Sequence, residues 1–374
     1  MGALVASSAV RTCFGDGART FAALLSGRCG AGPLRYGDPA ALNVAVGYHV
    51  ADDVGGDHAG RAGRLLADCL VDAVRGAGLD PARQRVPVLV GTGLRELGGV
   101  EDWALTGTPF PLSHLDFGDV VRAALPGVAD VVTLANACSA GGHALALAQD
   151  MVESGDAEAV VVAAADTMTR SMLAMIGKVT PEPGTRVRPF DRDRTGVLLG
   201  EGAAAVVVVG EGRPGRAVAR IAGTGLSCDA HHETSPDVNG IVRSMRDAFD
   251  RAGRAPSEVD LVVAHGTGTA LNDPAECRAL REVLLAAGGD PLVTGVKGAV
   301  GHTSGSAALI NLDVAARCLA HGVVPPVTGL REVLPEGAGL RFARGERVAA
   351  RPELVQVNAF GFGGVNAVTL VEAA

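Results

Sequence analysis

The feature that most constrains the fold is an internal repeat with a spacing of 175 residues. The segments 72–93 and 247–268 align without a gap and share nine residues, and each reads as a helix ended by glycine, a proline turn, an apolar strand and a Gly-Thr-Gly loop. The repeat predicts a duplicated fold, against the alternative of chance or convergent turn residues. The shared pairs are Asp72/Asp247, Ala73/Ala248, Ala77/Ala252, Gly78/Gly253, Pro81/Pro256, Val88/Val263, Gly91/Gly266, Thr92/Thr267 and Gly93/Gly268.

The two copies continue in parallel, each with a second apolar strand, a loop of small residues, a long helix and a strand-rich end. Strands that alternate with helices predict a largely parallel sheet covered by helices. Two such βαβαβ units packed face to face predict an α/β protein with five layers in the order αβαβα. We place the N-terminal half at residues 1–212 and the C-terminal half at 213–374, because Gly-Arg-Pro-Gly interrupts the pattern at 212–215.

Composition and charge exclude several classes of protein. The chain is 48% hydrophobic and has 41 acidic against 33 basic residues, so neither disorder nor nucleic-acid binding is expected. The apolar run 203–209 is about a third of the ~20 residues that a membrane helix needs, and the first residues do not resemble a signal peptide. Seven cysteines without a Cys-x-x-Cys pair indicate neither a disulfide framework nor a metal site. We expect a cytoplasmic protein that contacts neither nucleic acid nor membrane.

Cys138 lies between a predicted buried strand and a predicted helix, in the sequence Asn-Ala-Cys-Ser-Ala-Gly. The unpaired N–H groups and the positive dipole at the start of a helix favour thiolate over thiol. We therefore predict that Cys138 is a nucleophile. A buried structural cysteine is the alternative, and it is the interpretation that suits Cys69 and Cys318 within predicted helices.

Two histidines follow predicted strands of the C-terminal half. His265 comes directly after the apolar segment 259–264, and His302 occupies a glycine-rich loop after the strand 292–294. Each alone is compatible with an ordinary loop histidine. Because the repeat brings these strand ends to one sheet edge, we expect both rings to converge on Cys138.

Five ordered motifs resemble those of the β-ketoacyl synthase family. They span nearly the whole chain, and the resemblance implies the thiolase fold. The motifs are Asn-Ala-Cys-Ser-Ala-Gly (136–141), Pro-Phe-Asp-x-x-Arg-x-Gly (189–196) with Gly-Glu-Gly-Ala (200–203), His-Gly-Thr-Gly-Thr-x-x-Asn-Asp-x-x-Glu (265–276), Lys-Gly-Ala-Val-Gly-His (297–302) and Asn-Ala-Phe-Gly-Phe-Gly-Gly-x-Asn (358–366).

The resemblance implies a decarboxylative condensation. Cys138 would accept an acyl group from a thioester, with the oxyanion held by the N–H groups of Cys138 and Phe362. His265 and His302, both neutral, would donate hydrogen bonds to the carbonyl of a malonyl thioester as it loses CO₂. The resulting enolate would attack the acyl-cysteine and give a β-ketoacyl thioester.

The resemblance also implies how substrates and partners bind. The substrates would be carried on the phosphopantetheine arm of an acyl carrier protein or on coenzyme A, and no metal or redox cofactor would be needed. The chain would form a homodimer, or a heterodimer with a subunit resembling a chain-length factor. Thr267 and Thr269 match positions that bind the arm, and Phe360, Phe362 and Gly363 border the acyl pocket, with aromatic filling of the core as the alternative role for both phenylalanines. Candidate contacts for an acidic carrier are Arg186, Arg188, Arg192 and Arg194.

One position departs from the family pattern. Nine residues after His302, where the family has a glutamate that pairs with the lysine, this chain has Asn311. A buried Lys297 ammonium would then lack its expected counter-charge and would be protonated less readily. Glu276 is a possible substitute.

Two alternatives to condensation stay open at this point. One is an acyltransferase that uses Cys138 to form an ester or amide without loss of CO₂, which Asn311 favours. The other is a non-catalytic partner subunit resembling a chain-length factor, although such subunits lack the nucleophilic cysteine. The presence of both His265 and His302 favours condensation.

Overall fold

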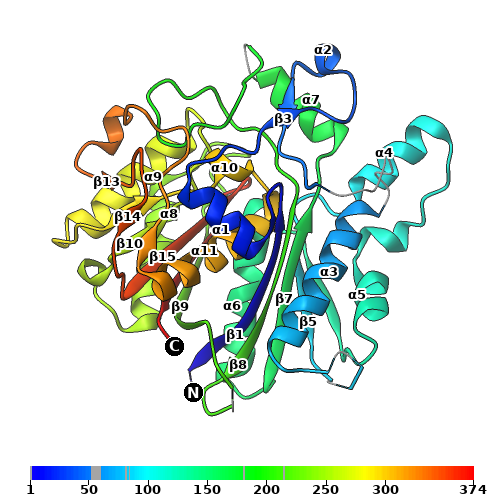
Figure 1. Cartoon of the computed structure of the whole chain (residues 1–374), viewed down its shortest axis with the longest axis horizontal. Helices are drawn as coiled ribbons and strands as arrows, with labels where there is room; N and C mark the ends of the chain where they lie inside the picture. The colour runs from blue at the N-terminus through cyan, green and yellow to red at the C-terminus, as the bar shows by residue number, and fades with distance from the viewer. Residues whose placement is uncertain (1, 52–59, 81, 84, 180–181, 214) are drawn as a thin grey trace.

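The computed structural model of the chain describes residues 2–51, 60–80, 82–83, 85–179, 182–213 and 215–374 (Figure 1). Pro81, one member of the sequence repeat, lies outside the described residues. Twelve of the described strands form one sheet, which the short pairing of β1 with β9 joins across its middle.

The two halves of the sheet have the same strand order. In the N-terminal half the order is β1 (Ala3–Thr12), β8 (Gly202–Gly210), β7 (Ala159–Asp166), β5 (Val88–Gly91) and β6 (Val131–Leu134); in the C-terminal half it is β9 (Ala219–Cys228), β16 (Val365–Glu372), β15 (Leu354–Gly361), β10 (Leu261–Val263) and β11 (Leu292–Thr294). In each half three strands are parallel and the strand beside them is antiparallel. This repetition matches the duplication that the sequence predicted.

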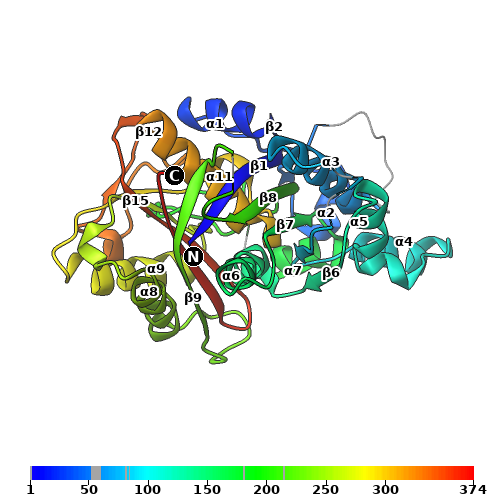
Figure 2. The ribbon, with the colours of Figure 1, turned by 90° about the horizontal axis from the view of Figure 1, so that it is seen from below.

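Helices cover both faces of each half-sheet, which makes five layers (Figure 2). The central layer consists of α6 (Ala140–Glu153) and α11 (Ala307–His321), whose apolar side chains share one core with the inner faces of both half-sheets. α3 (Arg61–Gly76) and α5 (Gly118–Ala124) cover the outer face of the N-terminal half, and α8 (Val238–Ala252) and α9 (Asn272–Leu280) cover that of the C-terminal half. The predicted αβαβα sandwich is therefore confirmed.

β7 illustrates how the sequence produces this arrangement. All eight of its residues, Ala-Val-Val-Val-Ala-Ala-Ala-Asp, are buried, because helices cover both faces of the strand. Val160 and Val162 face the central helices, whereas Val161 and Ala163 face α3. An uninterrupted run of small and β-branched residues is what such a position requires.

The sequence repeat keeps its register in the helices but not in the strands. α3 and α8 bury side chains at matched positions 175 residues apart, such as Ala73 and Ala248. The same spacing pairs Val88, which faces the outer helices, with Val263, which faces the central ones. Since side chains alternate along a strand, the gapless alignment is wrong there, and a one-residue shift is needed between helix and strand.

The other described elements are short or peripheral. Within the described residues, no helix is long and apolar enough to cross a membrane. The predicted boundary at 212/213 falls in the connection between β8 and β9. The remaining helices are α1 (Gly17–Leu25), α2 (Pro39–Leu42), α4 (Leu97–Thr106), α7 (Arg170–Val179), α10 (Lys297–Val300), a π-helical turn (Arg281–Leu285) and the 3₁₀ turns Leu112–Leu115, Ala137–Ser139, Pro256–Glu258, Ser304–Ser306 and Pro335–Gly337. The remaining strands have two residues each: β2 (Gly15–Asp16), β3 (Gly32–Pro33), β4 (Val46–Gly47), β12 (Val323–Val324), β13 (Arg341–Phe342) and β14 (Val348–Ala349).

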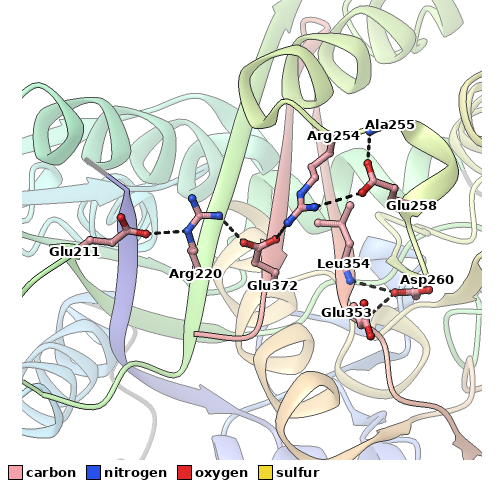
Figure 3. Close-up of polar contacts among 9 residues, drawn as sticks. All are labelled: Glu211, Arg220, Arg254, Ala255, Glu258, Asp260, Glu353, Leu354 and Glu372. Carbon is pink, nitrogen blue, oxygen red and sulfur yellow. Dashed lines mark hydrogen bonds and ion pairs between the residues drawn. The ribbon is translucent and has the colours of Figure 1, made fainter.

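A chain of ion pairs ties the last strand to its neighbours (Figure 3). Glu372 of β16 pairs with Arg220 of β9 through one carboxylate oxygen and with Arg254, which follows α8, through the other, at 2.7 Å for the second pair. Arg220 also pairs with Glu211 at 2.9 Å, and Arg254 with Glu258 at 3.3 Å. One carboxylate thus links two strands and a helix end.

We predict that Glu372→Gln lowers the free energy of unfolding by about 1 kcal/mol, because it removes the charge shared by two arginines. Urea denaturation at low and high salt measures this change, and the difference should shrink at high salt. Glu353→Gln, which removes an exposed charge outside these ion pairs, is the matched control. Equal stability of the two variants would show that the ion pairs contribute nothing.

Candidate active site

One pocket brings together most of the residues singled out from the sequence. It lies at the carboxyl ends of the parallel strands, where the start of α6 from one half meets loops of the other. Lys297, Glu276 and Asn311 are buried and are not among its lining residues. The predicted residues that line it are Cys138, His265, His302, Thr267, Thr269, Phe360, Phe362 and Gly363.

Cys138 is presented by a tight elbow between β6 and α6. Residues 137–139 form a 3₁₀ turn, and Ala137 has a φ of +49°, an uncommon conformation for a residue with a Cβ. The backbone N–H groups of Cys138 and Phe362 both reach the sulfur as hydrogen-bond donors. The elbow thus places the sulfur in the pocket beside two amide donors.

The predicted preference for thiolate at Cys138 is wrong. Burial raises the pKa of the Cys138 thiol to about 11, although the Lys297 charge and the two amides oppose the rise; the Asp166 charge adds to it. Desolvation outweighs the Lys297 charge and the two amide donors, which are the groups that lower the pKa. The free chain therefore holds a neutral thiol at pH 7.

The hydrogen bonds of His265 fix its tautomer. Its Nδ1 atom accepts from the Phe360 N–H at 3.3 Å and lies 3.3 Å from Lys297 Nζ. With donors on Nδ1, the ring hydrogen resides on Nε2, and the ring acts as a donor there. Burial, together with the nearby Lys297 charge, lowers the pKa of His265 well below its usual value, so the ring is neutral.

His302 is held by a short ladder of backbone hydrogen bonds. Its N–H donates to Leu198 O and its carbonyl accepts from Gly200 N, both at 2.9 Å, and Tyr48 N donates to Leu199 O. The rings of His302 and His265 are perpendicular, with centroids 5.4 Å apart. Burial lowers the pKa of His302 well below its usual value, so this ring is neutral too.

Lys297 lies behind the two histidines, almost wholly buried. Its ammonium donates to the carbonyl oxygen of His265 and contacts the ring of that residue. Burial lowers the pKa of Lys297 to about 8, and the Glu276 charge opposes the shift. No ion pair joins Lys297 to a carboxylate in the part of the chain that the structure describes.

Glu276 and Asp273 support the loop that carries His265. The Glu276 carboxylate accepts from the N–H groups of His265 and Gly266, each at 2.8 Å; it stabilises the Lys297 ammonium through its charge, without forming a direct ion pair with it. Asp273, which the sequence analysis did not single out, accepts from the N–H groups of Thr267, Gly268 and Phe190. The Asn-Asp pair within the 265–276 motif was the available signal.

Asn311 sits beside the backbone of this loop. Its Nδ2 donates to Ala264 O at 3.3 Å and to Asn358 O at 3.5 Å. Its Oδ1 has no hydrogen-bond partner among the described residues, although it is buried. The amide therefore contributes neither a charge nor a bond to Lys297.

The mouth of the pocket carries the two threonines and an exposed aromatic ring. The hydroxyl oxygens of Thr267 and Thr269 lie 2.9 Å apart, and Arg194 donates to Thr269 O at 2.9 Å. Phe362 is 44% exposed, which rules out core filling for that ring, whereas Phe360 is buried in the outer core and also borders the pocket. The predicted alternative of aromatic filling thus applies only to Phe360.

The sequence analysis missed the apolar side of the pocket. Met172, Met175 and Ile176 of α7 and Val197 and Leu199 line it. The amphipathic sequence of α7 was the signal available for these pocket-lining residues, and it was weak. Among the described residues, no group of three or more histidine, cysteine, aspartate or glutamate side chains is placed to hold a metal ion.

Comparison with protein families gives two matches. Residues 57–211 match the model described as "Beta-ketoacyl synthase, N-terminal domain" and residues 218–331 match "Beta-ketoacyl synthase, C-terminal domain". A 3-oxoacyl-[acyl-carrier-protein] synthase 2 of Coxiella burnetii is 29% identical over 75% of this chain and 74% of its own length. The protein of the same name from Mycobacterium tuberculosis is 32% identical over 64% of this chain and 60% of its own length.

Solved structures give the same fold. The structure titled "The ishigamide ketosynthase/chain length factor" is 30% identical with a TM-score of 0.90, and the match covers 100% of this chain and 99% of that one. A second structure, of a type II polyketide acyl-carrier protein in complex with its ketosynthase, AntDE:AntF, is 19% identical with a TM-score of 0.90, and the match covers 100% and 99% of the two chains. These neighbours confirm the thiolase fold.

The raised pKa of Cys138 predicts a distinct pH profile for its alkylation. Since iodoacetamide reacts with the thiolate, its rate at Cys138 should keep rising from pH 7 to 10, toward a midpoint at about 11. Peptide mass mapping measures the rate at this residue, with N-acetylcysteine as the reference thiol. A plateau below pH 8 would instead restore the helix-start argument.

Proposed function

The chain belongs to the β-ketoacyl synthase family, and we propose that it condenses an acyl thioester with a malonyl-type thioester in fatty-acid or polyketide synthesis. One observation carries this proposal: Cys138 of one half and two neutral histidines of the other, His265 and His302, line one pocket. The fixed Nε2–H tautomer of His265 supplies the donor that an enolate oxygen needs.

The first step is acyl transfer to Cys138. The sulfur loses its proton as it attacks the thioester carbonyl, and the oxyanion that forms accepts hydrogen bonds from the N–H groups of Cys138 and Phe362. Each such donor contributes about 3 kcal/mol of transition-state stabilisation. Collapse of the intermediate breaks the bond to the carrier sulfur, which leaves with the proton, and the acyl group stays on Cys138.

The second step breaks a bond of the malonyl thioester. The bond between its carboxylate carbon and its α-carbon is cleaved, CO₂ leaves, and the electron pair forms an enolate. His265 and His302 donate hydrogen bonds to the enolate oxygen, and neutral rings do so without giving up their protons. The α-carbon then attacks the acyl carbonyl, the Cys138 sulfur leaves and regains a proton, and a β-ketoacyl thioester is released.

This reaction combines acyl transfer, decarboxylation and proton transfer and needs no external oxidant or reductant, so we propose that it requires no metal or redox cofactor. We propose an acyl carrier protein as the donor partner, in the cytoplasm, with Thr267 and Thr269 facing its phosphopantetheine arm. The AntDE:AntF structure, an acyl-carrier protein in complex with its ketosynthase, supports the carrier as a partner. The ishigamide ketosynthase/chain length factor supports a dimer, either with a second copy or with a chain-length-factor-like subunit. Among the candidate docking residues, Arg192 is paired with Glu332, and Arg194 donates to the backbone carbonyls of Thr269 and Asp191. Arg186 and Arg188 are therefore the better candidates.

Asn311 supports a second candidate, acyl transfer from Cys138 to an alcohol or amine without loss of CO₂. Lys297 lies in this chain without an ion-pair partner in the described residues, so the part of the site associated with decarboxylation is altered. A purely non-catalytic partner subunit is disfavoured, because Cys138 retains the elbow, the amide donors and an open pocket.

We predict that incubation with an acyl carrier thioester adds one acyl mass to the chain, and that a malonyl carrier then releases CO₂. Cys138→Ala should abolish the acyl adduct, whereas His302→Ala should keep the adduct and lower CO₂ release by about 10²-fold, since one donor is lost. Intact-protein mass spectrometry and trapping of labelled CO₂ measure the two steps.

Cys318→Ala, at the far end of α11, is the matched control and should form the adduct normally. An adduct without CO₂ release, but with an ester or amide product, would favour the second candidate. No adduct with any of a panel of acyl donors would contradict both.

We predict that Asn311→Glu shifts the alkaline decline in the rate of CO₂ release to a pH about one unit higher. The Asn311 side chain donates to Ala264 O, next to the His265 carbonyl that Lys297 binds, so a carboxylate there favours the ammonium form of Lys297 and raises its pKa, which is about 8 in the present chain. The measurement is CO₂ release from pH 6 to 10, with Asn311→Gln as a control that changes size without charge. An identical alkaline decline in all three proteins would show that the Lys297 proton does not set it.

A further inference from the structure

The elbow that presents Cys138 has a structural counterpart in the C-terminal half. Residues 304–306 form a 3₁₀ turn at the start of α11, as residues 137–139 do at the start of α6. Ala137 and Ser304, the first residues of the two turns, both have a φ of +49°. The spacing of 167 residues places Gly305 where the first elbow has Cys138.

Side-chain bonds show the same correspondence. Ser139 Oγ donates to the carbonyl of Asn136 at 3.1 Å, and Ser306 Oγ donates to that of Thr303 at 2.8 Å. The second elbow is therefore built like the first but has no nucleophile.

The amides around the second elbow already hold an anion, the side chain of Asp166. Its Oδ2 accepts from Gly305 N at 2.7 Å and Gly93 N at 2.9 Å, and its Oδ1 accepts from Leu94 N at 2.8 Å and Thr92 Oγ at 2.7 Å. Asp166 is only 1% exposed. In the first elbow, the amide that corresponds to Gly305 N is that of Cys138, which acts as a donor to the Cys138 thiol.

Asp166 also joins parts of both halves. It ends β7, and it binds the loop after β5 and the turn before α11 at the same time. Gly93 lies between the two elbows: a Cβ there would be 3.3 Å from Ser304 Cβ and 3.4 Å from the Ala137 carbonyl carbon. Because His302 precedes Gly305 by only three residues, the hydrogen bonds of Asp166 help to fix the distance between His302 and Cys138.

We propose that Asp166 is a positioning residue that fills the amide-lined hollow of the second elbow and thereby fixes His302 relative to Cys138. Its effect on turnover rests on the proposed function, whereas its occupation of an anion-binding hollow does not. Without the carboxylate, the buried N–H of Gly305 and the part-buried N–H groups of Gly93 and Leu94 would lose their acceptor, and a small anion of the same shape would fit them.

Asp166→Ala tests this assignment by opening the hollow, with formate as the probe. We expect CO₂ release to fall about 100-fold, since small displacements of reacting groups cost that much. Formate should restore most of the loss, and it should raise the melting temperature of Asp166→Ala but not of the parent. Asp166→Asn fills the hollow with an amide and should not respond to formate.

The pH dependence of Cys138 alkylation distinguishes a positioning role of Asp166 from a purely structural one. The Asp166 charge favours the protonated thiol, so alkylation of Cys138 in Asp166→Ala should reach its midpoint at a lower pH, and formate should move it back. Asp313→Ala is the matched control: this buried carboxylate binds Ser8 and Arg317, and its loss should leave the alkylation profile and the formate response unchanged.

A folded Asp166→Ala protein that is insensitive to formate in melting, alkylation and turnover would overturn the proposal. Unchanged CO₂ release in that variant would equally show that Asp166 does not position His302. If the parent itself releases no CO₂, the proposed function fails, while the melting and alkylation responses to formate still decide the role of Asp166.

Discussion

The close approach of α6 and α11 at their first turns is the constraint on which the site depends. A Cβ atom on Gly141 would lie 2.7 Å from the carbonyl oxygen of Gly305, and one on Gly142 would lie 2.8 Å from the Ala367 Cβ. Only hydrogen fits at these positions, so α6 begins almost in contact with the turn before α11 at Gly141 and with β16 at Gly142. The same packing accounts for a core of alanine, valine and leucine in a chain with 3% aromatic residues.

Burial then sets the charge of the groups that this packing brings together. It raises the pKa of Cys138 and lowers those of His265 and His302, so a neutral thiol faces two neutral rings. Lys297 adds a positive charge behind the rings, which further disfavours imidazolium. Neutral imidazole donors can stabilise an enolate without protonating it. A neutral thiol is compatible with nucleophilic attack, because the thiol can lose its proton while its sulfur attacks a carbonyl carbon.

The sequence predicted the topology and the pairing of Cys138 with His265 and His302, because both follow from local patterns. Strand and helix periodicities identify strand ends, and the repeat brings those ends to one edge. It did not predict the protonation of Cys138, since desolvation depends on packing from the whole fold. The sequence also did not predict which N–H groups Asp166 and Glu276 bind. Those groups belong to loops that come near the carboxylates only in the tertiary structure.

The duplicated fold creates a difficulty that the chain resolves differently in its two halves. The second residue of each elbow carries a backbone amide that needs an acceptor, because buried amides without acceptors are costly. At the second elbow the protein supplies its own acceptor, Asp166, and keeps glycine where a nucleophile would stand. At the first elbow the donors of Cys138 and Phe362 stay available to whatever enters the pocket. Under the proposed function, the nucleophile therefore comes from the N-terminal half and the ring donors from the C-terminal half, because only one of two equivalent turns is left open to substrate.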